Sequence, residues 1–158
     1  MKRLKSICLL FVALGLWCRA DADNDLAAAS RVAVNGMKLQ SARLKVVSQN
    51  IASASTTGMT PGAQPYRRKI MLVQKQYDSL LGAEISVLKA VTHDRSDFIM
   101  RYEPNHPSAD AHGIVLYPNV DPVLEMADAK EAQRSYEANL SSLEISKSNQ
   151  IRLLEAMK

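Results

Sequence analysis

Cysteine is nearly absent from this chain, and the little that it has lies at one end. The only two cysteines are Cys8 and Cys18. The rest of the chain therefore has no residue for a disulfide, a thiolate nucleophile or a cysteine-bound metal. Stability beyond this first segment has to come from packing alone.

Acidic residues are absent from residues 1–20, although the whole chain has 20 basic and 16 acidic residues. The basic residues of this segment are Lys2, Arg3, Lys5 and Arg19. Without them the remaining charges balance, so the net charge of +4 belongs to the first segment alone. The composition gives no argument for nucleic acid or an acidic membrane surface as a partner.

A long hydrophobic run is also missing. The apolar stretch Ile7–Cys18 has about twelve residues, too few to cross a hydrocarbon core of about 30 Å. It follows a basic start and precedes small residues of the kind found at cleavage sites, so residues 1–22 are predicted to be a signal-peptide leader. Two alternatives stay open: an apolar start of the first helix, and a lipid-modified Cys18, which the bulky Trp17 disfavours.

Proline is scarce at both ends of the remaining chain, and apolar residues recur there at steps of three and four. This spacing predicts one amphipathic helix from Asp25 to about Ser53, capped by Asp23–Asp25, and a second over Val123–Met157. The apolar positions are Leu26, Ala29, Ala33, Met37, Leu44, Val47 and Ile51 in the first helix, and Met126, Ala129, Tyr136, Leu140, Leu143, Ile151, Leu154 and Met157 in the second.

Polar residues and one glycine, Gly36, interrupt these stripes and weaken the expected seam between the helices. The polar residues near core-facing positions are Gln40, Gln133, Lys147 and Gln150. An isolated pair of such helices would be marginally stable, so the helices are expected to complete their burial against other chains.

The middle of the chain is predicted to be a loop followed by short strands. The strand-like runs are Arg67–Tyr77, Glu84–Val91, Phe98–Tyr102 and Ile114–Tyr117. The fold class is therefore α+β, with two long terminal helices in a coiled-coil-like pair that enclose a small β-rich middle segment. The predicted divisions are residues 1–22 for the leader, 23–57 and 122–158 for the helices, and 58–121 for the loop and insert.

Candidate catalytic and metal-binding groups are few. His106, Asp110 and His112 could offer three metal ligands, but their segment is rich in proline and glycine, as turns are. His93 and Asp94 are sequence neighbours, which point to opposite sides of an extended chain and so do not form a base with its orienting carboxylate. The sequence predicts no enzymatic activity, cofactor, metal or small-molecule substrate.

The stretch LKVVSQNIASASTTG ends a helix in an unusual way, since Ala52 to Thr57 are all small or hydroxylated. The longer segment SARLKVVSQNIASASTTG resembles the N-terminal signature of flagellar basal-body rod and hook proteins, in which Asn-Leu/Ile-Ala-Asn is followed by Thr and Gly. Asn50, Ile51 and Ala52 match this signature, and Ser53 replaces its second Asn. The stretches PGAQPYRRK, YEPNHPSADAHGIVLYPNVD and EMADAKEAQRSYEANL are similar to the FlgC-type, proximal-rod branch of the family.

The resemblance implies a structural subunit of the flagellar rod, the driveshaft in the periplasmic space between the inner-membrane motor and the hook. The implied partners are other rod proteins, the neighbouring ring and export components, and further copies of the chain, joined through the terminal helices. The residues implied in assembly are Leu44, Val47, Asn50, Ile51, Ala52, Ser53 and Gly58. The small residues would allow close contact with neighbouring subunits, and Asn50 is expected to hydrogen-bond across that contact.

Residue type adds further interface candidates, since arginine pairs with carboxylates and aromatic residues are enriched at interfaces. These candidates are Arg67, Arg68, Tyr136, Asn139, Leu140 and Leu143. Bland alternatives are a solvated strand end for the arginines and a core position for the tyrosine. The alternative function is a monomeric periplasmic binding or adaptor module, which would need a concave pocket lined by aromatic and acidic residues.

The predicted leader fits the resemblance poorly, because rod proteins normally leave the cell through the flagellum's own export channel without a cleaved leader. The chain either uses the general secretory pathway, starts further downstream than Met1, or keeps an N-terminal extension.

Overall fold

The computed structural model describes residues 2–79 and 81–156, with side chains from Leu26 onward. It contains six elements, in the order helix, four strands, helix. They are α1 (Lys2–Ser53), β1 (Lys69–Asp78), β2 (Ala83–His93), β3 (Ile99–Tyr102), β4 (Ile114–Tyr117) and α2 (Pro122–Ala156). The predicted α+β class is confirmed, and both ends of each predicted strand lie within three residues of the ends of an observed strand.

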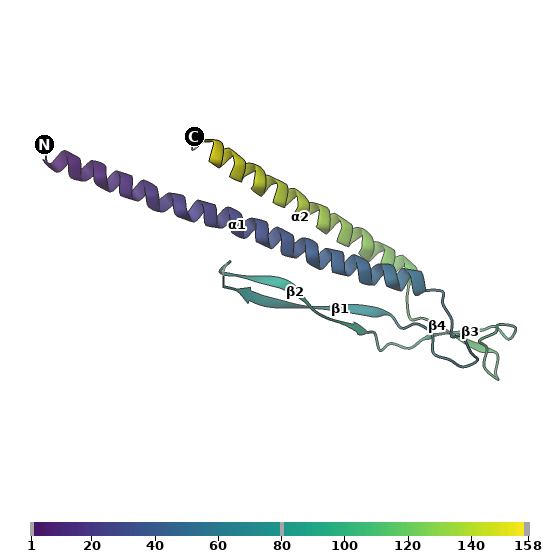
Figure 1. Cartoon of the computed structure of the whole chain (residues 1–158). Coiled ribbons are helices and arrows are strands. Elements are labelled where there is room, and N and C mark those ends of the chain that lie inside the picture. The colour runs from purple at the N-terminus through teal and green to yellow at the C-terminus, as the bar shows by residue number, and fades with distance from the viewer. Residues whose placement is uncertain (1, 80, 157–158) are drawn as a thin grey trace.

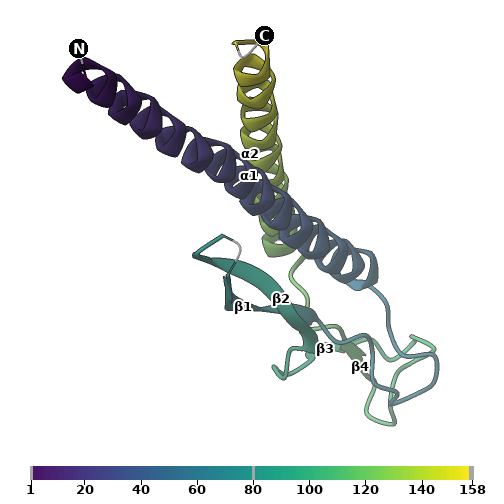
Figure 2. The same cartoon turned by 60° about the vertical axis from the view of Figure 1, so that its left-hand side comes forward.

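α1 is the central element of the fold. Figures 1 and 2 show α2 along one side of α1 and the β1–β2 hairpin along another, while β3 and β4 lie beyond the end of α1. The two helices meet where α1 ends and α2 begins, and they separate toward the chain termini. No helix in the described part of the chain is both long and apolar enough to cross a membrane.

The first helix is longer than the apolar spacing predicted. α1 is continuous over 52 residues, about 80 Å at 1.5 Å per residue, so Asp23–Asp25 lie within it and do not cap its start. The prediction of a helix start near Asp25 is therefore wrong for the backbone. The side chains of the predicted leader, residues 1–22, lie outside the described ones, as does Met157 on the predicted stripe, so both remain predictions.

α2 begins at a well-formed cap. Oδ1 of Asp121 accepts hydrogen bonds from the backbone N–H of Val123 at 2.9 Å and of Leu124 at 3.5 Å. Pro122 occupies the first helical position, where its missing N–H costs nothing and its fixed φ suits a helix. These two residues place the start of α2 beside the end of α1.

The seam between the helices is built from small and polar residues more than from the predicted apolar stripe. Buried and half-buried residues of α2 recur at alternating steps of four and three, as in a coiled coil, with only Ser135 outside the pattern. They are Glu125, Ala129, Ala132, Tyr136, Asn139, Leu143, Ser146 and Gln150. By contrast Met126, Ile151 and Leu154 of the predicted stripe are more than half exposed, so within the single chain they do not take part in the seam.

Gly36 has the opposite role to the one predicted. A Cβ atom at this position would lie 2.6 Å from Oδ1 of Asn139, so the end of the Asn139 side chain would have to move. The glycine therefore makes room for a polar side chain of α2 and does not simply weaken the seam. Close approach through small residues replaces apolar burial here.

The strands form two separate antiparallel hairpins. β1 pairs with β2 from Lys69 opposite His93 to Asp78 opposite Ala83, with a register shift between Leu72 and Val73. The second hairpin joins β3 and β4. Two-stranded hairpins have little stability alone, so contact with α1 supports the longer one.

Candidate functional site

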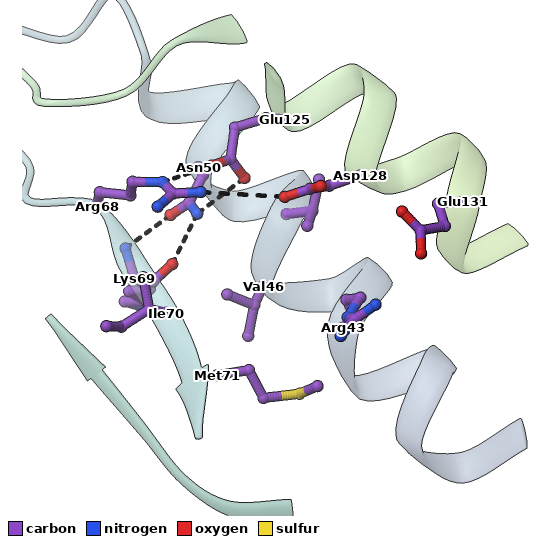
Figure 3. Close-up of a pocket in the computed structure, with 11 residues that line it drawn as sticks. Arg43, Val46, Asn50, Arg68, Lys69, Ile70, Met71, Glu125, Asp128 and Glu131 are labelled. Carbon is purple, nitrogen blue, oxygen red and sulfur yellow. Dashed lines mark hydrogen bonds and ion pairs between the residues drawn. The ribbon is translucent and has the colours of Figure 1, made fainter. Parts of the chain in front are cut away.

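Asn50 lies at the centre of a buried polar junction that joins α1, α2 and the segment entering β1. Its side chain is only 1% exposed. Nδ2 donates to the backbone oxygen of Lys69 at 2.8 Å and to Oε2 of Glu125 at 3.0 Å. Oδ1 accepts from the Tyr66 hydroxyl at 2.8 Å and from the Lys69 N–H at 2.9 Å. All four hydrogen-bonding positions of the amide are therefore filled. Figure 3 shows Asn50 between Lys69 and Glu125.

This geometry corrects one expectation from the sequence. Asn50 was expected to hydrogen-bond to a neighbouring subunit, but it has no free donor or acceptor for one. Its chemistry instead requires a residue with two donors and two acceptors in one plane, which only Asn or Gln supplies. Within this subunit it fixes the end of α1 against the strand and the second helix.

Glu125 is the buried charge of the junction, with a side chain 1% exposed. Oε1 accepts a hydrogen bond from Nε of Arg68 at 2.6 Å, and Oε2 accepts the bond from Asn50. A buried carboxylate is tolerated only when it is paired and hydrogen-bonded, and both conditions are met here. Removal of Arg68 would leave a costly unpaired charge, and removal of Asn50 would leave Oε2 without its hydrogen-bond donor.

Arg68 extends the junction toward solvent. Beyond Glu125, its guanidinium lies 3.7 Å from Oδ2 of Asp94 and 4.0 Å from Oδ2 of Asp128. Burial works against its charge, but the hydrogen bond that Arg68 donates to Glu125 and the attraction of the three carboxylates outweigh burial, so the pKa of Arg68 is raised. The arginine therefore stays charged at any relevant pH.

The pKa values of Tyr66 and Asp94 are shifted in opposite directions. Burial, followed by repulsion from Glu125, raises the pKa of the Tyr66 hydroxyl, which keeps it a donor to Asn50. A hydrogen bond from the Ser96 backbone is the main cause of the lowered pKa of Asp94, and Arg68 adds to it. Both shifts favour the protonation states that the contacts require.

Arg67 is engaged within the chain as well. Its guanidinium donates to the backbone oxygens of Asp94 at 3.1 Å and Ser96 at 3.0 Å. It also lies 4.1 Å from the centre of the Phe98 ring, a distance typical of a cation–π contact. Neither Arg67 nor Arg68 is therefore a simple solvated strand end, and both hold the hairpin to its surroundings.

A cavity of about 400 Å³ opens beside the junction, between α1, α2 and β1. Figure 3 shows Val46 and Met71 on its side toward the strand, and Arg43 and Glu131 at the far side from Asn50. It has no nucleophile with an adjacent base and no phosphate-binding loop, and no group of three potential metal ligands occurs among the described residues. The contacts of the junction hold α1, α2 and β1 in one arrangement.

The histidine cluster considered as a metal site serves the loop instead. Oδ1 of Asp110 accepts hydrogen bonds from the backbone N–H of His112 at 2.8 Å and of Ile114 at 2.9 Å. Both bonds lower the pKa of Asp110, and the one from Ile114 has the larger effect. Nδ1 of His106 accepts from the Ser108 N–H at 3.1 Å. The groups therefore stabilise turns.

The small residues after Asn50 allow two loops to lie against each other. Ser108 is buried, and its hydroxyl donates to the backbone oxygen of Gly58. A Cβ atom on Gly58 would lie 2.6 Å from the backbone oxygen of Ala63. The close approach expected from the sequence is thus present within one chain, and contact with other subunits stays a prediction.

The remaining predicted assembly residues fall into two groups. Val47 is buried, and Leu44, Ile51, Ser53, Tyr136, Asn139 and Leu143 are half-buried. Ala52 is exposed, and Leu140 is 37% exposed. Tyr136 is therefore not buried between the helices as expected, and Asn139 donates to the Ser135 backbone oxygen of its own helix at 2.8 Å.

Sequence reasoning missed Glu125 and Asn119 as members of this site, while Tyr66 stood out only as an aromatic residue for an interface or the core. Asn119 accepts a hydrogen bond from the Arg68 N–H at 2.8 Å, so three distant segments converge on one short stretch. The available signal was Glu125, a charged residue in the first turn of a predicted helix, but that position also suits a helix dipole on the surface. Only the fold distinguishes the two roles.

Two family models match the chain. Residues 31–63 match the model "Flagella basal body rod protein", and residues 111–155 match "Flagellar basal body rod FlgEFG protein C-terminal". These segments contain the end of α1 and nearly all of α2, and so both helical sides of the junction.

Curated relatives cover most of the chain. The chain is 50% identical to the flagellar basal-body rod protein FlgC of Agrobacterium fabrum over 73% of its own length and 83% of the relative's. It is 34% identical to FlgC of Bacillus subtilis over 80% of its own length and 95% of the relative's. It is 39% identical to FlgC of Salmonella typhimurium over 78% of its own length and 91% of the relative's. The chain therefore belongs to the family of the flagellar basal-body rod protein FlgC, a non-enzymatic structural subunit of the rod that spans the periplasm.

Proposed function

We propose that this subunit joins the rod through the outward faces of α1 and α2, while the Asn50 junction fixes the hairpin to the helices. The observation that carries this proposal is the uncovered apolar surface of α2. Val123 is 74% exposed, and Leu124, Ile145 and Leu154 are each 62% exposed. These side chains lie on more than one side of α2, and large exposed apolar side chains along a helix are typical of a helix that binds other chains.

The end of α2 supports the same proposal. Residues 151–156 are exposed on every side of the helix, although Ile151, Leu153 and Leu154 are apolar. A helix gains most of its stability in proteins from packing, so this segment requires neighbours that the single chain does not provide. Copies of this chain and other rod proteins are the proposed neighbours, together with nearby ring and export components.

A torque-transmitting role follows from the junction. Torque loads the contacts between the helices and the β-rich segment, and a buried network with directed hydrogen bonds resists relative rotation better than apolar contact alone. Asn50, Glu125 and Arg68 are the proposed centre of this resistance.

The test measures swimming in a bacterial strain from which the gene for this rod protein has been deleted. The intact chain should restore swimming and basal bodies. A variant with Ile145, Ile151 and Leu154 changed to Asp should be made and exported but should give no rods, because charges cannot be buried against neighbours. Normal rods from this variant would contradict assembly through the face of α2. The purified chain should also sediment faster when mixed with rod proteins than alone.

A further inference from the structure

Charge is strongly segregated between the two halves of this chain. Residues 26–77 contain eight basic residues and no acidic one. α2 contains six acidic residues and four basic ones. A balanced total thus hides a basic first half that includes the described side chains of α1.

The basic residues of α1 border a groove between α1 and α2. Two adjoining hollows of about 470 and 480 Å³ share Val34 and Lys38 as lining residues. Arg31, Lys38 and Lys45 recur every seven residues and are exposed, so they form one row along the helix. We name these hollows and this row the basic groove.

The interior of the basic groove is apolar and its rim is positively charged. Val34 and Met37 from α1 and Tyr136 and Leu143 from α2 supply apolar surface. Lys147 adds a fourth positive charge from α2, and among the described residues Asp78 is the one acidic residue that lines either hollow. No ion pair joins Arg31, Lys38 or Lys45 to an acid among the described residues.

The outer face of α2 has the complementary pattern. Glu137 and Glu144 are exposed, are seven residues apart like Lys38 and Lys45, and form no ion pair within the described chain. Leu140 lies between them, one turn from each, and is 37% exposed. Seven residues span about 10.5 Å on either helix, so two opposite-charge pairs can form in register.

We propose that the basic groove receives the outer face of α2 from a second copy of this chain, with Lys38 and Lys45 opposite Glu137 and Glu144. This proposal rests on the proposed function and names the contact through which copies join. Apolar contact around Leu140 supplies most of the affinity, and the charges set partner and register. The two surfaces differ, so the contact is head-to-tail, and such a contact builds an open helical assembly when its rotation does not close a ring.

A cross-linking experiment tests this arrangement directly. Cys8 and Cys18 are first changed to Ser, and this background must support swimming. Lys38→Cys is placed in one copy and Glu137→Cys in another, both are expressed in one strain, and basal bodies are oxidised. We expect a dimer of the chain when both variants are present and none with either alone. Cross-links from Lys38→Cys only to a different protein, or to a second Lys38→Cys, would overturn the proposal.

Charge exchange is the second arm. The variants Lys38→Glu/Lys45→Glu and Glu137→Lys/Glu144→Lys should each reduce the number of rods per cell about tenfold, equivalent to about 1.4 kcal/mol. The variant with all four changes should recover most of this loss, since each pair is restored with its charges exchanged. A matched control, Lys89→Glu/Arg95→Glu, makes the same change in charge at two exposed positions outside the helices and should leave rod numbers unchanged.

The outcomes separate this inference from the proposed function. Normal rods from both double variants would overturn the pairing while leaving assembly through α2 intact. Loss of rods in the double variants without recovery in the fourfold variant would also overturn it, because the charges would then meet some other partner. Normal rods from the strain lacking the gene would contradict the proposed function itself.

Discussion

Gly36 of α1 and Asn139 of α2 are fitted to each other: a Cβ atom on the glycine would lie 2.6 Å from Oδ1 of the asparagine. The asparagine is held in place by its hydrogen bond to the Ser135 backbone oxygen. Close packing of a polar side chain on a glycine fixes the position of one helix along the other. A pair of purely apolar stripes would allow more sliding.

The first prediction concerns this pair. Gly36→Ala gains about 1 kcal/mol of helix propensity but must displace Asn139, and overpacking costs about 1–3 kcal/mol. We expect a net fall in the free energy of unfolding, measured by urea denaturation. Gly36→Ala combined with Asn139→Ala should be more stable than Gly36→Ala alone, because the clash is removed. Equal stability of the two variants would show that the pair does not interact.

The second prediction concerns the buried junction. Asn50→Ala leaves Glu125 and the Lys69 N–H without their partner, and each unsatisfied buried group costs about 1–3 kcal/mol. Asn50→Asp should be worse still, because it adds a second carboxylate 3.0 Å from Glu125 where an N–H donor was. Ser48→Ala, on the exposed side of the same helix, is the control and should be nearly neutral.

The third prediction is a pH dependence. The pKa of Tyr66 is raised by burial and by Glu125 above its ordinary value of 10.0. Its contribution to stability is therefore complete below about pH 10 and is lost as the pH rises through the folded-state pKa. Tyr66→Phe should be about 1 kcal/mol less stable at pH 8, since it loses one hydrogen bond. Urea denaturation at pH 8 and pH 11 should show this difference shrinking, and an unchanged difference would contradict the shift.

The fourth prediction concerns the start of the chain. If residues 1–22 act as a cleaved leader, N-terminal sequencing of the protein from isolated basal bodies should begin near Asp21 or Asp23. The shorter α1 would still include every buried residue of this helix whose side chain the structure describes, from Ala33 onward. Mass spectrometry that finds Met1 intact in assembled rods would rule out cleavage.

The sequence predicts the elements well but not the side of α2 that faces α1. The spacing of Met126, Ile151 and Leu154 indicates a helix, and the helix is present, yet these residues point to solvent in the single chain. Apolar periodicity identifies surface that will be buried, without saying whether the partner is the same chain. An assembling subunit has apolar residues both in its internal seam and on its assembly surface, so their spacing does not distinguish the two. The seam is formed at Ala132 and Ser146 instead.

The junction could not be predicted from the sequence, for a different reason. Asn50 was singled out through its place in a motif, but Glu125 is 75 residues away and only the fold brings them together. A hydrogen-bonded network leaves no periodic pattern in sequence. Arg68 was noticed for its charge, and its buried partner could not be known before the helix start was placed.

The last prediction separates stability from assembly at Tyr136. This ring is half-buried and lines the basic groove beside Met37 and Lys45. Loss of a fully buried aromatic ring costs about 3–5 kcal/mol, so Tyr136→Ala should cost the isolated chain clearly less than that. A rod repeats the loss at every copy, so we expect cells without flagella although the variant is made and exported. Tyr136→Phe keeps the ring and serves as the control, with normal swimming expected. Cells with Tyr136→Ala that swim as well as the control would show that this side of the helix pair is not an assembly surface.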